Sequence, residues 1–316
     1  MLDLTLLGSG GGMPMPNRFL SSMIINFKGR KILIDCGEGT QVAMRKFKTG
    51  FKSLDIICIT HCHGDHIFGL PGLLSTIGNS DRVEPITIIG PMGIGDVMKS
   101  LLDVISYLPF DINIIEDPKT ELYLNLDYQL LTVKNQRDLY DEEIIIRTLD
   151  LEHSSPCLGY SFYLTRKREF LPEKAIDNKI PQKLWGKLQN GETIIVKDKT
   201  FIPETVLGQW RNGIKLSYVT DTRPINTIVD FIKESDLFVC EGTYGDSEDL
   251  PKAMKNFHMT FQEAGDLAFR GKVDQLLLTH FSTAMDNVEE YIDNAKDKFS
   301  NVILGYDGLN KQLKYK

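Results

Sequence analysis

The sequence predicts a mixed α/β fold, and three observations support this. Short apolar runs of the β type alternate with segments of helical periodicity through most of the chain. Side chains of the metal-ligand type repeatedly stand directly after strand-like runs. No internal repeat or low-complexity tract interrupts this order. Because a rigid sheet holds its strand ends in place, side chains that follow different strands can meet at one site.

The strand predictions rest on short apolar or β-branched runs bounded by turn residues. A glycine turn at Gly29-Arg30 is expected to join two of them as a hairpin. The predicted strands are residues 2–7, 22–27, 31–35, 56–59, 85–89, 111–115, 128–133, 144–149, 214–220, 237–240 and 275–279.

The helix predictions rest on apolar positions at helical spacing. Thr260 and Glu263 stand three residues apart and fit a capping box. The glycine-rich run at residues 8–12 lacks the spacing of a dinucleotide loop, and the Met-Pro-Met-Pro that follows does not open a helix. We therefore expect a loop there and no nucleotide cofactor. The predicted helices are residues 38–47, 70–77, 94–106, 225–233, 260–269 and 288–299.

The alternation stops after residue 164. Residues 166–203 are charged, hold three prolines and show no sustained period, and Trp185 is expected to be exposed among lysines. Segment 165–203 carries nine basic and five acidic residues, a net charge of +4, on a chain of net charge −7. We predict one domain over residues 1–316 with an inserted arm at 165–203. On charge alone, the arm fits a phosphate-backbone contact and a solvated surface segment equally well.

Composition sets the class and the compartment. Hydrophobic residues make up 42% of the chain and charged residues 25%, as in an ordinary globular protein. No apolar run approaches the roughly 18 residues of a membrane span, and the first residues lack the pattern of a signal peptide. The five cysteines include no C-x-x-C pair and fit reduced thiols. We expect a cytoplasmic protein without a membrane segment.

One hexapeptide carries the strongest chemical signal. Residues 61–66 read His-Cys-His-Gly-Asp-His and hold three of the six histidines, directly after the predicted strand 56–59. Imidazole nitrogen and carboxylate oxygen are ligands that zinc takes at about 2.0–2.2 Å. The alternative is a polar loop whose histidines form local hydrogen bonds.

Further candidate ligands follow other strand-like runs, although each alone could be a turn or cap residue. The candidate metal ligands are His61, His63, Asp65, His66, His153, Asp221 and His280. Seven ligands exceed the four of one tetrahedral ion and suit two ions about 3.5–4 Å apart that share a carboxylate. Such a pair lowers the pKa of a shared water and stabilises both oxygens of an in-line displacement at phosphorus. Zinc, manganese and iron would all fit these ligands.

The string from Thr60 to His66, with Asp221 and His280 downstream, resembles the motif series of the metallo-β-lactamase superfamily. The continuation Gly-Leu-Pro-Gly-Leu-Leu at 69–74 and the inserted arm are similar to ribonuclease Z, the tRNA 3′-processing endonucleases. This resemblance implies a four-layer αββα sandwich of the metallo-β-lactamase type with a projecting flexible arm. It also implies a zinc-dependent endoribonuclease that removes the 3′ trailer from precursor tRNA by metal-activated water attack.

The resemblance also implies roles for individual residues. One of two Zn²⁺ would take His61, His63 and His153, and the second would take Asp65, His66 and His280, with Asp221 bridging. Asp65 would act as general base, while Glu241 and His258 would steady the leaving oxygen and assist its protonation.

The implied substrate contacts lie in two places. Lys183 and Lys187 of the arm would bind tRNA in a homodimer, from the subunit opposite to the one that cuts. Arg18 would bind it from a loop near the N-terminus. Residues 14–19 read Pro-Met-Pro-Asn-Arg-Phe where the family often has P-x-K-x-R-N, which leaves discrimination against tRNAs already bearing CCA open.

Two other functions compete with the endoribonuclease. One is a small-molecule phosphodiesterase or arylsulfatase on the same binuclear scaffold, which has no evident need for a basic arm. The other is an RNA-binding protein with a degenerate site, which is hard to reconcile with a ligand at every expected position.

Overall fold

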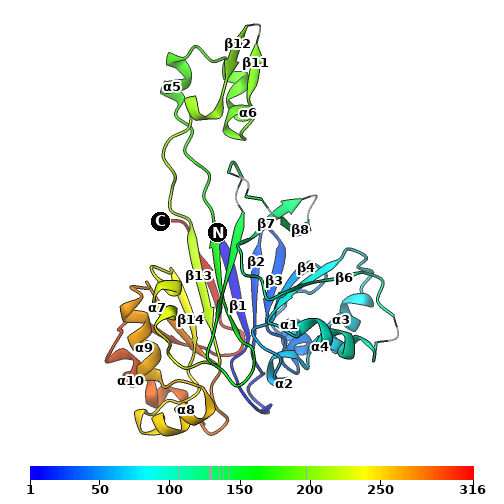
Figure 1. Cartoon of the computed structure of the whole chain (residues 1–316), viewed down its shortest axis with the longest axis vertical. Helices are drawn as coiled ribbons and strands as arrows, with labels where there is room; N and C mark the ends of the chain where they lie inside the picture. Colours follow the sequence, from blue (N-terminus) through cyan, green and yellow to red (C-terminus); the bar gives the residue numbers. More distant parts are fainter. Residues whose placement is uncertain (106, 128–129, 135, 138, 142, 197) are drawn as a thin grey trace.

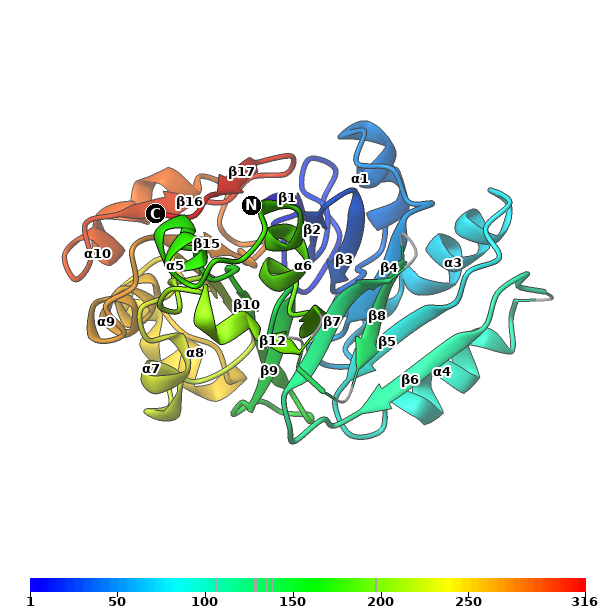
Figure 2. The same cartoon turned by 90° about the horizontal axis from the view of Figure 1, so that it is seen from above.

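Two large β-sheets face each other, and helices cover their outer faces, so the body has four layers in the order α, β, β, α (Figure 2). The computed structural model describes residues 1–316 except 106, 128–129, 135, 138, 142 and 197. Three apolar clusters fill the spaces between these layers. The largest lies between the sheets and contains inward-facing side chains of both, such as Ile56 and Tyr218.

The first sheet has the strand order β17-β1-β2-β3-β4-β5-β6. Its strands β3 to β6 are parallel neighbours, while β17, β1, β2 and β3 pair antiparallel. The strands are β1 (Leu2–Gly8), β2 (Ser22–Phe27), β3 (Arg30–Ile34), β4 (Leu54–Cys58), β5 (Ile86–Gly90), β6 (Ile112–Glu116) and β17 (Asn310–Leu313).

The second sheet has the order β16-β15-β14-β13-β10-β9-β7-β8. Strands β13 to β16 run parallel, and β10 pairs antiparallel with both β13 and β9. The strands are β7 (Leu122–Asp127), β8 (Leu130–Lys134), β9 (Ile144–Asp150), β10 (Leu158–Leu164), β13 (Ile214–Val219), β14 (Leu237–Glu241), β15 (Leu276–Thr279) and β16 (Val302–Leu304).

The helices form the two outer layers. Helices α1 (Thr40–Lys46), α3 (Leu70–Gly78) and α4 (Ile94–Leu102) cover the first sheet, and α7 (Thr227–Ile232), α9 (Phe261–Arg270) and α10 (Ile292–Lys296) cover the second. Two short helices, α2 (Gly64–Ile67) and α8 (Leu250–Asn256), stand near the lower edge in Figure 1. The predicted capping box is confirmed at the start of α9. No helix in the described part of the chain is long and apolar enough to cross a membrane.

Most predicted elements are confirmed within two or three residues of their expected ends. Strands β7, β10, β16 and β17, helices α2 and α8, and all the elements of the segment between β10 and β13 were not predicted from the sequence. The single helix predicted at 288–299 is wrong, because a 3₁₀ turn at Val288–Tyr291 precedes the short α10. The strand predicted at 128–133 is the second half of a hairpin with β7. Tyr128, Ser106 and Lys197, which belonged to predicted elements or to the charge count of the arm, lie outside the described residues.

The segment between β10 and β13 projects from one end of the sandwich as a separate lobe (Figure 1). It holds α5 (Pro172–Asp177), α6 (Trp185–Gln189) and a hairpin of β11 (Ile194–Val196) and β12 (Lys199–Phe201), packed around its own small apolar cluster. The expectation of an exposed Trp185 was wrong. Its ring packs 5.3 Å from that of Phe170, and its Nε1 donates to the Ile180 carbonyl at 3.1 Å.

Candidate metal centre

The candidate ligands gather at one edge of the sandwich because they follow the carboxyl ends of strands. Residues 61–66 come after β4, Asp221 comes after β13, and His280 comes after β15. Asp221 and His280 both adopt the left-handed backbone conformation, with φ of 52° and 57°. Such a conformation costs about 1–3 kcal/mol for a residue other than glycine, and residues that hold it often serve a function.

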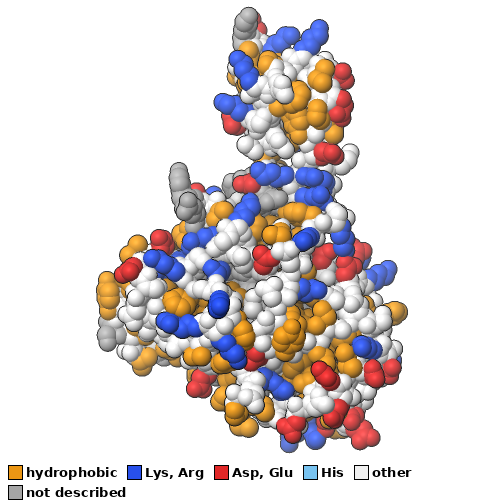
Figure 3. All heavy atoms as spheres, turned by 180° about the vertical axis from the view of Figure 1, so that it is seen from behind, with side chains coloured by type: hydrophobic (Ala, Val, Ile, Leu, Met, Phe, Trp, Pro, Cys, Tyr) orange, Lys and Arg blue, Asp and Glu red, His pale blue; other side chains and the backbone are white. Residues whose placement is uncertain are grey.

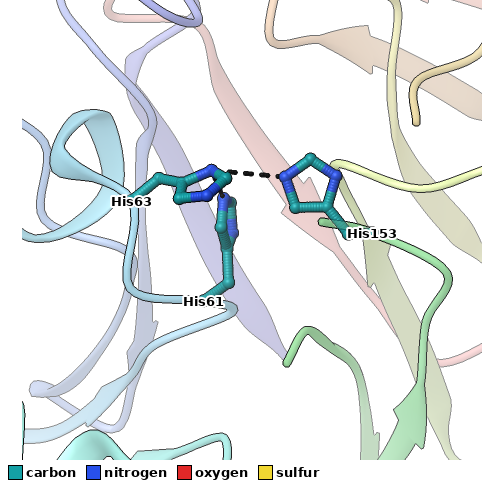
Figure 4. A group of neighbouring side chains, drawn as sticks. All are labelled: His61, His63 and His153. Carbon is teal, nitrogen blue, oxygen red and sulfur yellow. Dashed lines mark hydrogen bonds between the residues drawn. The ribbon is translucent and has the colours of Figure 1, made fainter. Parts of the chain in front are cut away.

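The first group of ligands is formed by three imidazoles. The Nε2 of His61 lies 3.0 Å from Nδ1 of His63, and the Nε2 of His153 lies 3.3 Å from the same Nδ1. Figure 4 shows the three rings turned toward one another, two from the loop after β4 and one from the segment after β9. All three ligand atoms lie within 4.8 Å of one another.

The second group joins a carboxylate to two imidazoles. The Nε2 atoms of His66 and His280 are 3.3 Å apart, and Oδ2 of Asp65 lies 3.5 Å from each. His66 and His280 are almost completely buried, while Asp65 is partly exposed to the cleft. This trio again brings its three ligand atoms within 4.8 Å.

Asp221 lies between the two groups and offers one oxygen to each. Its Oδ2 is 3.6 Å from Nε2 of His61 and 3.9 Å from that of His153. Its Oδ1 is 3.6 Å from Nε2 of His66 and 3.2 Å from that of His280. A carboxylate divided in this way is arranged to bridge two cations.

The spacing of these atoms fits metal coordination. Tetrahedral ligands at about 2.0–2.2 Å from zinc stand about 3.3–3.6 Å from one another, and the separations here run from 3.0 to 3.9 Å. Imidazole nitrogens that face each other this closely repel unless a proton or a cation lies between them. The donor set therefore suits two cations, each with three protein ligands in addition to the shared Asp221.

The second nitrogen of most of these imidazoles has its own partner, which fixes the direction of the ring. His66 Nδ1 lies 2.8 Å from Oδ2 of the buried Asp35, and His61 Nδ1 lies 3.1 Å from the Thr60 hydroxyl. The Thr60 amide and hydroxyl bond Asp35 in turn. Asp35 therefore holds both the histidine and the start of the ligand loop.

The two candidate ligands that lie far from the hexapeptide in sequence and bind as imidazoles, His153 and His280, are held by residues that follow β14. His153 Nδ1 lies 3.3 Å from the carbonyl oxygen of Phe257, a residue in the left-handed conformation with φ of 59°. His280 Nδ1 lies 3.0 Å from the hydroxyl of Thr243. The same hydroxyl donates to Oε2 of Glu241 at 2.6 Å, so Thr243 joins a candidate ligand to a candidate catalytic pair.

Glu241 and His258 form that pair next to the second group. His258 Nδ1 lies 3.1 Å from Oε2 of the fully buried Glu241, and its ring stacks on that of His280 with centroids 5.6 Å apart. Burial acts to lower the pKa of His258, but the Glu241 carboxylate outweighs it and raises that pKa to about 9. His258 lines the cleft of about 340 Å³ that also exposes His63, Asp65 and His153.

The candidate ligands differ in the direction in which their pKa values are shifted. Burial acts to raise the pKa of Asp65, yet His280 and His66 hold it well below its usual range. Burial lowers the pKa of His61, with His66 adding to the effect. Burial acts the same way on His66, but Asp35 and Asp221 outweigh it and raise that pKa. The lowered pKa of Asp65 keeps its carboxyl group ionised at neutral pH.

The glycine loop after β1 closes over the second group. The Gly12 amide donates to Oδ2 of Asp65 at 2.6 Å. A Cβ atom on Gly11 would lie 2.3 Å from the His280 ring, so only glycine fits at this approach. The glycine-rich loop at residues 8–12, which was not expected to bind a dinucleotide, thus contacts the candidate metal ligands Asp65 and His280 directly.

The predicted substrate-binding residues lie outside this cleft. Arg18 is engaged with the chain itself, because its guanidinium donates to the carbonyl oxygens of Ser282 and Met285 at 3.3 and 3.2 Å. It lines a neighbouring hollow of about 300 Å³. Lys183 and Lys187 are exposed on the arm, and Lys187 lies 3.7 Å from Glu192.

The seven candidate ligands were all predicted from the sequence, whereas the residues that orient them were not. Asp35 follows a strand directly, as the candidate ligands do, and this position could have identified it as part of the site. Thr243, Phe257 and Gly11 gave no comparable signal, because their contacts depend on elements distant in sequence.

The fold and the centre first define a class, the metallo-β-lactamase fold proteins. The crystal structure of one of these, YhfI from Bacillus subtilis, has a TM-score of 0.67 and 18% identity, covering 99% of this chain and 100% of that one. The human tRNase Z short form has a TM-score of 0.67 and 25% identity, with 99% of each chain covered.

Sequence relatives narrow the class. The ribonuclease Z of Alkaliphilus oremlandii is 60% identical over 316 residues, covering 100% of both chains. A family model described as anti-Pycsar protein Apyc1 matches residues 2–207. The chain therefore belongs to the ribonuclease Z family and, over residues 2–207, to the family that the Apyc1 model describes. The family resemblance and the sandwich expected from the sequence are confirmed.

Proposed function

We propose that this protein is a metal-dependent endoribonuclease that removes the 3′ trailer from precursor tRNA. The observation that carries the proposal is the position of Asp221, whose two carboxylate oxygens face two separate groups of candidate ligands. We propose two Zn²⁺ per chain, with His61, His63 and His153 at one ion, Asp65, His66 and His280 at the other, and Asp221 between them. When bound, the ions supply a water of lowered pKa and positive charge beside the phosphoryl oxygens.

The side chains around the centre then move protons. Ionised Asp65 accepts the proton of the attacking water, while the Gly12 amide keeps its carboxylate oriented. His258 is protonated at neutral pH and donates to the leaving oxygen through the ring nitrogen that Glu241 does not hold. Glu241 thus acts on the reaction through His258.

The position of the arm supports its proposed use by a second subunit. The arm connects the carboxyl end of β10 to the amino end of β13, and these strands are antiparallel neighbours. The arm therefore leaves the sandwich at the edge opposite to the one where Asp221 follows β13 (Figure 1). We propose one domain over residues 1–316 whose arm at 165–203, including Lys183 and Lys187, holds tRNA for the cleft of a partner in a homodimer. Arg18 is proposed to contact the same RNA near the cleft.

The proposed location is the cytoplasm. All five cysteines are free thiols, and Cys36, Cys58, Cys157 and Cys240 are buried. Burial raises the pKa of each of these four thiols, which keeps them unreactive. Such thiols suit a reducing compartment.

The deciding experiment is cleavage of a 3′-extended precursor tRNA with end mapping. Residues 171–206 would be replaced by a short Gly-Ser linker, which keeps the Phe170–Leu207 pairing at the base of the arm. We expect precise 3′ trailer removal by the intact chain and a large loss by the armless one, while a small phosphodiester is hydrolysed equally by both. Equal tRNA cleavage by both would favour the small-molecule phosphodiesterase or arylsulfatase.

A mixing experiment tests the homodimer. Asp65→Asn protein has an arm but a disabled centre, and the armless protein has a centre but no arm. If the arm acts on the partner subunit, a mixture of the two recovers cleavage that neither shows alone. A mixture as inactive as its components would contradict action between subunits.

A further inference from the structure

The arm joins the body through a neck that consists of residues 165–170 leading out and 207–213 returning. The two sides pair as an antiparallel bridge at Phe170 and Leu207, and the Gly208 amide donates to the Glu169 carbonyl at 2.8 Å. The neck carries three arginines, Arg166 and Arg168 on one side and Arg211 on the other. Figure 3 shows basic side chains gathered where the arm meets the body.

These three arginines are fixed in place without being neutralised. Arg168 donates through Nε to the Gly208 carbonyl at 2.7 Å, and Arg211 donates through Nε to the Lys167 carbonyl at 2.7 Å. Arg166 donates to the main-chain oxygen of Lys316 at 2.8 Å. Within the described residues, no Asp or Glu side chain forms an ion pair with any of the three. The internal carbonyls that accept from Arg168 and Arg211 orient their guanidinium groups and leave their positive charges uncompensated.

Aromatic rings contact two of these three guanidinium groups, those of Arg166 and Arg168. Trp210 of the neck is 51% exposed, and the guanidinium carbons of Arg168 and Arg137 lie 5.4 and 5.5 Å from its ring centroid. Arg166 lies 5.0 Å from the ring of Tyr315. Cation–π contacts of this kind restrict long side chains, so less entropy is lost when an anion binds.

The neck is flanked by two hollows that share Tyr163, Arg166, Trp210 and Arg211. The larger hollow has a volume of about 680 Å³ and also exposes Lys215 and Lys233. It contains three acidic residues, but Asp236 and Asp274 are both paired with Lys316. The hollow therefore keeps an excess of positive charge and has room for a nucleotide unit.

We propose that the neck binds the phosphate backbone of the RNA that the arm holds, so that RNA contact extends from the arm onto the body. This inference rests on the proposed function for the identity of the RNA. Planar guanidiniums oriented by carbonyls and rings match phosphate oxygens in geometry and in charge. The neck also stands directly beneath the arm, next to the RNA that the arm is proposed to hold (Figure 1).

The test replaces Arg166, Arg168 and Arg211 by glutamine and measures the Kd for a 3′-extended precursor tRNA over a range of salt concentrations. We expect Kd to rise at least about 10-fold near 0.1 M salt and the slope of log K against log salt to fall by about 2, since each lost phosphate contact removes about 0.7–0.9. As a matched control, Arg270→Gln, Lys296→Gln and Lys298→Gln remove three charges from α9 and the α10 region. The control should leave both quantities unchanged.

A second variant separates charge from structure, because Arg168 and Arg211 also brace the neck. Replacing the three arginines by lysine keeps the charge, so it should restore the salt slope and part of the affinity. Melting temperature and hydrolysis of a small phosphodiester report whether the glutamine variant still folds. A lysine variant as weak as the glutamine variant in both affinity and slope would overturn the proposal.

The remaining outcomes are also decisive. Unchanged Kd and slope in the glutamine variant overturn the proposal, as does a loss of dimer mass, which would make the neck a contact between subunits. The native chain could also bind anionic vesicles and fail to bind tRNA. If the glutamine variant then loses vesicle binding, the surface belongs to a membrane contact and the proposal is overturned. If the native chain binds precursor tRNA through the neck but does not cut it, the proposed function fails while this inference stands.

Discussion

The two ends of β4 carry two different buried ionic clusters. At its start, Asp55 accepts from Arg30 at 2.7 Å, from Arg82 at 3.0 Å and from the Leu131 amide at 2.9 Å. Arg82 is completely buried, and its other N–H groups donate to the carbonyls of Glu84, Lys52 and Pro85. Each charged group here faces an opposite charge or a hydrogen-bond partner. We call such a cluster closed, because it needs no further ligand to be satisfied.

At the carboxyl end of the same strand, bases face bases. Nitrogen atoms of His61 and His63 lie 3.0 Å apart, and the carboxylates of Asp65 and Asp221 stand among imidazoles. We propose that bound cations complete this cluster. Burial and charge are common to both clusters, and the feature that distinguishes the candidate site is the convergence of nitrogen and oxygen lone pairs on one another. Four experiments test this difference between the two clusters.

The largest effect is expected from Asp65→Asn. The substitution removes both a proposed metal ligand and the proposed proton acceptor, so we expect turnover of precursor tRNA to fall at least about 10³-fold, together with weaker metal retention. Cleavage kinetics and metal analysis of the purified variant measure this. A variant that keeps full metal content and near-native turnover would remove Asp65 from its proposed role.

Metal removal should act on one end of β4 only. The native chain is expected to hold close to two equivalents of metal. In the presence of free metal at 1,000 times its Kd, binding should add about 4 kcal/mol to the free energy of unfolding, and a chelator should remove this contribution. Denaturant unfolding with and without zinc checks this. One equivalent or none in the purified protein would contradict a paired centre.

Arg82→Met opens the closed cluster. It leaves Asp55 with only part of its compensation, and breaking such a buried pair costs about 3–5 kcal/mol, so we expect a loss of about 3 kcal/mol in denaturant unfolding. Metal content and turnover of the folded protein should stay native, because Arg82 does not contact the centre. A loss of metal at unchanged stability would reverse the assignment of the two clusters.

The smallest effect is expected from Thr243→Val. The hydroxyl orients His280 and bonds Glu241, and residues behind metal ligands typically contribute 10–100-fold to metal affinity or activity. We expect turnover to fall about 10-fold and Thr243→Ser to recover most of it. If serine fails where valine fails, the role of Thr243 is packing and not its hydroxyl.

The same contrast explains what the sequence could predict. The hexapeptide 61–66 concentrates ligands in one loop, and His153, Asp221 and His280 each end an apolar run, so position along strands was enough to assemble the set. The hairpin partner β7 was missed because its alternation includes polar Asn125 and Asp127. Arg82 gave no signal, since it is held by the Lys52 carbonyl and the Asp55 carboxylate, which lie 30 and 27 positions away and are brought to it only by the fold.

The arm shows the other limit of local pattern. Its charged, proline-containing sequence has no period, yet Ala175, Ile180, Leu188 and Val206 form a core of their own. Trp185 was misplaced because a single aromatic between lysines does not reveal that Phe170 folds back onto it. Four apolar residues spread over about thirty positions are too sparse for a periodicity argument.

The pairing of Phe170 with Leu207 has an evolutionary consequence. Because the two residues lie side by side at the base of the arm, the segment between them can be lengthened, shortened or exchanged without disturbing the register of either sheet. The segment proposed to hold the substrate can therefore be exchanged as a unit, while the candidate metal centre at the opposite edge is under separate selection.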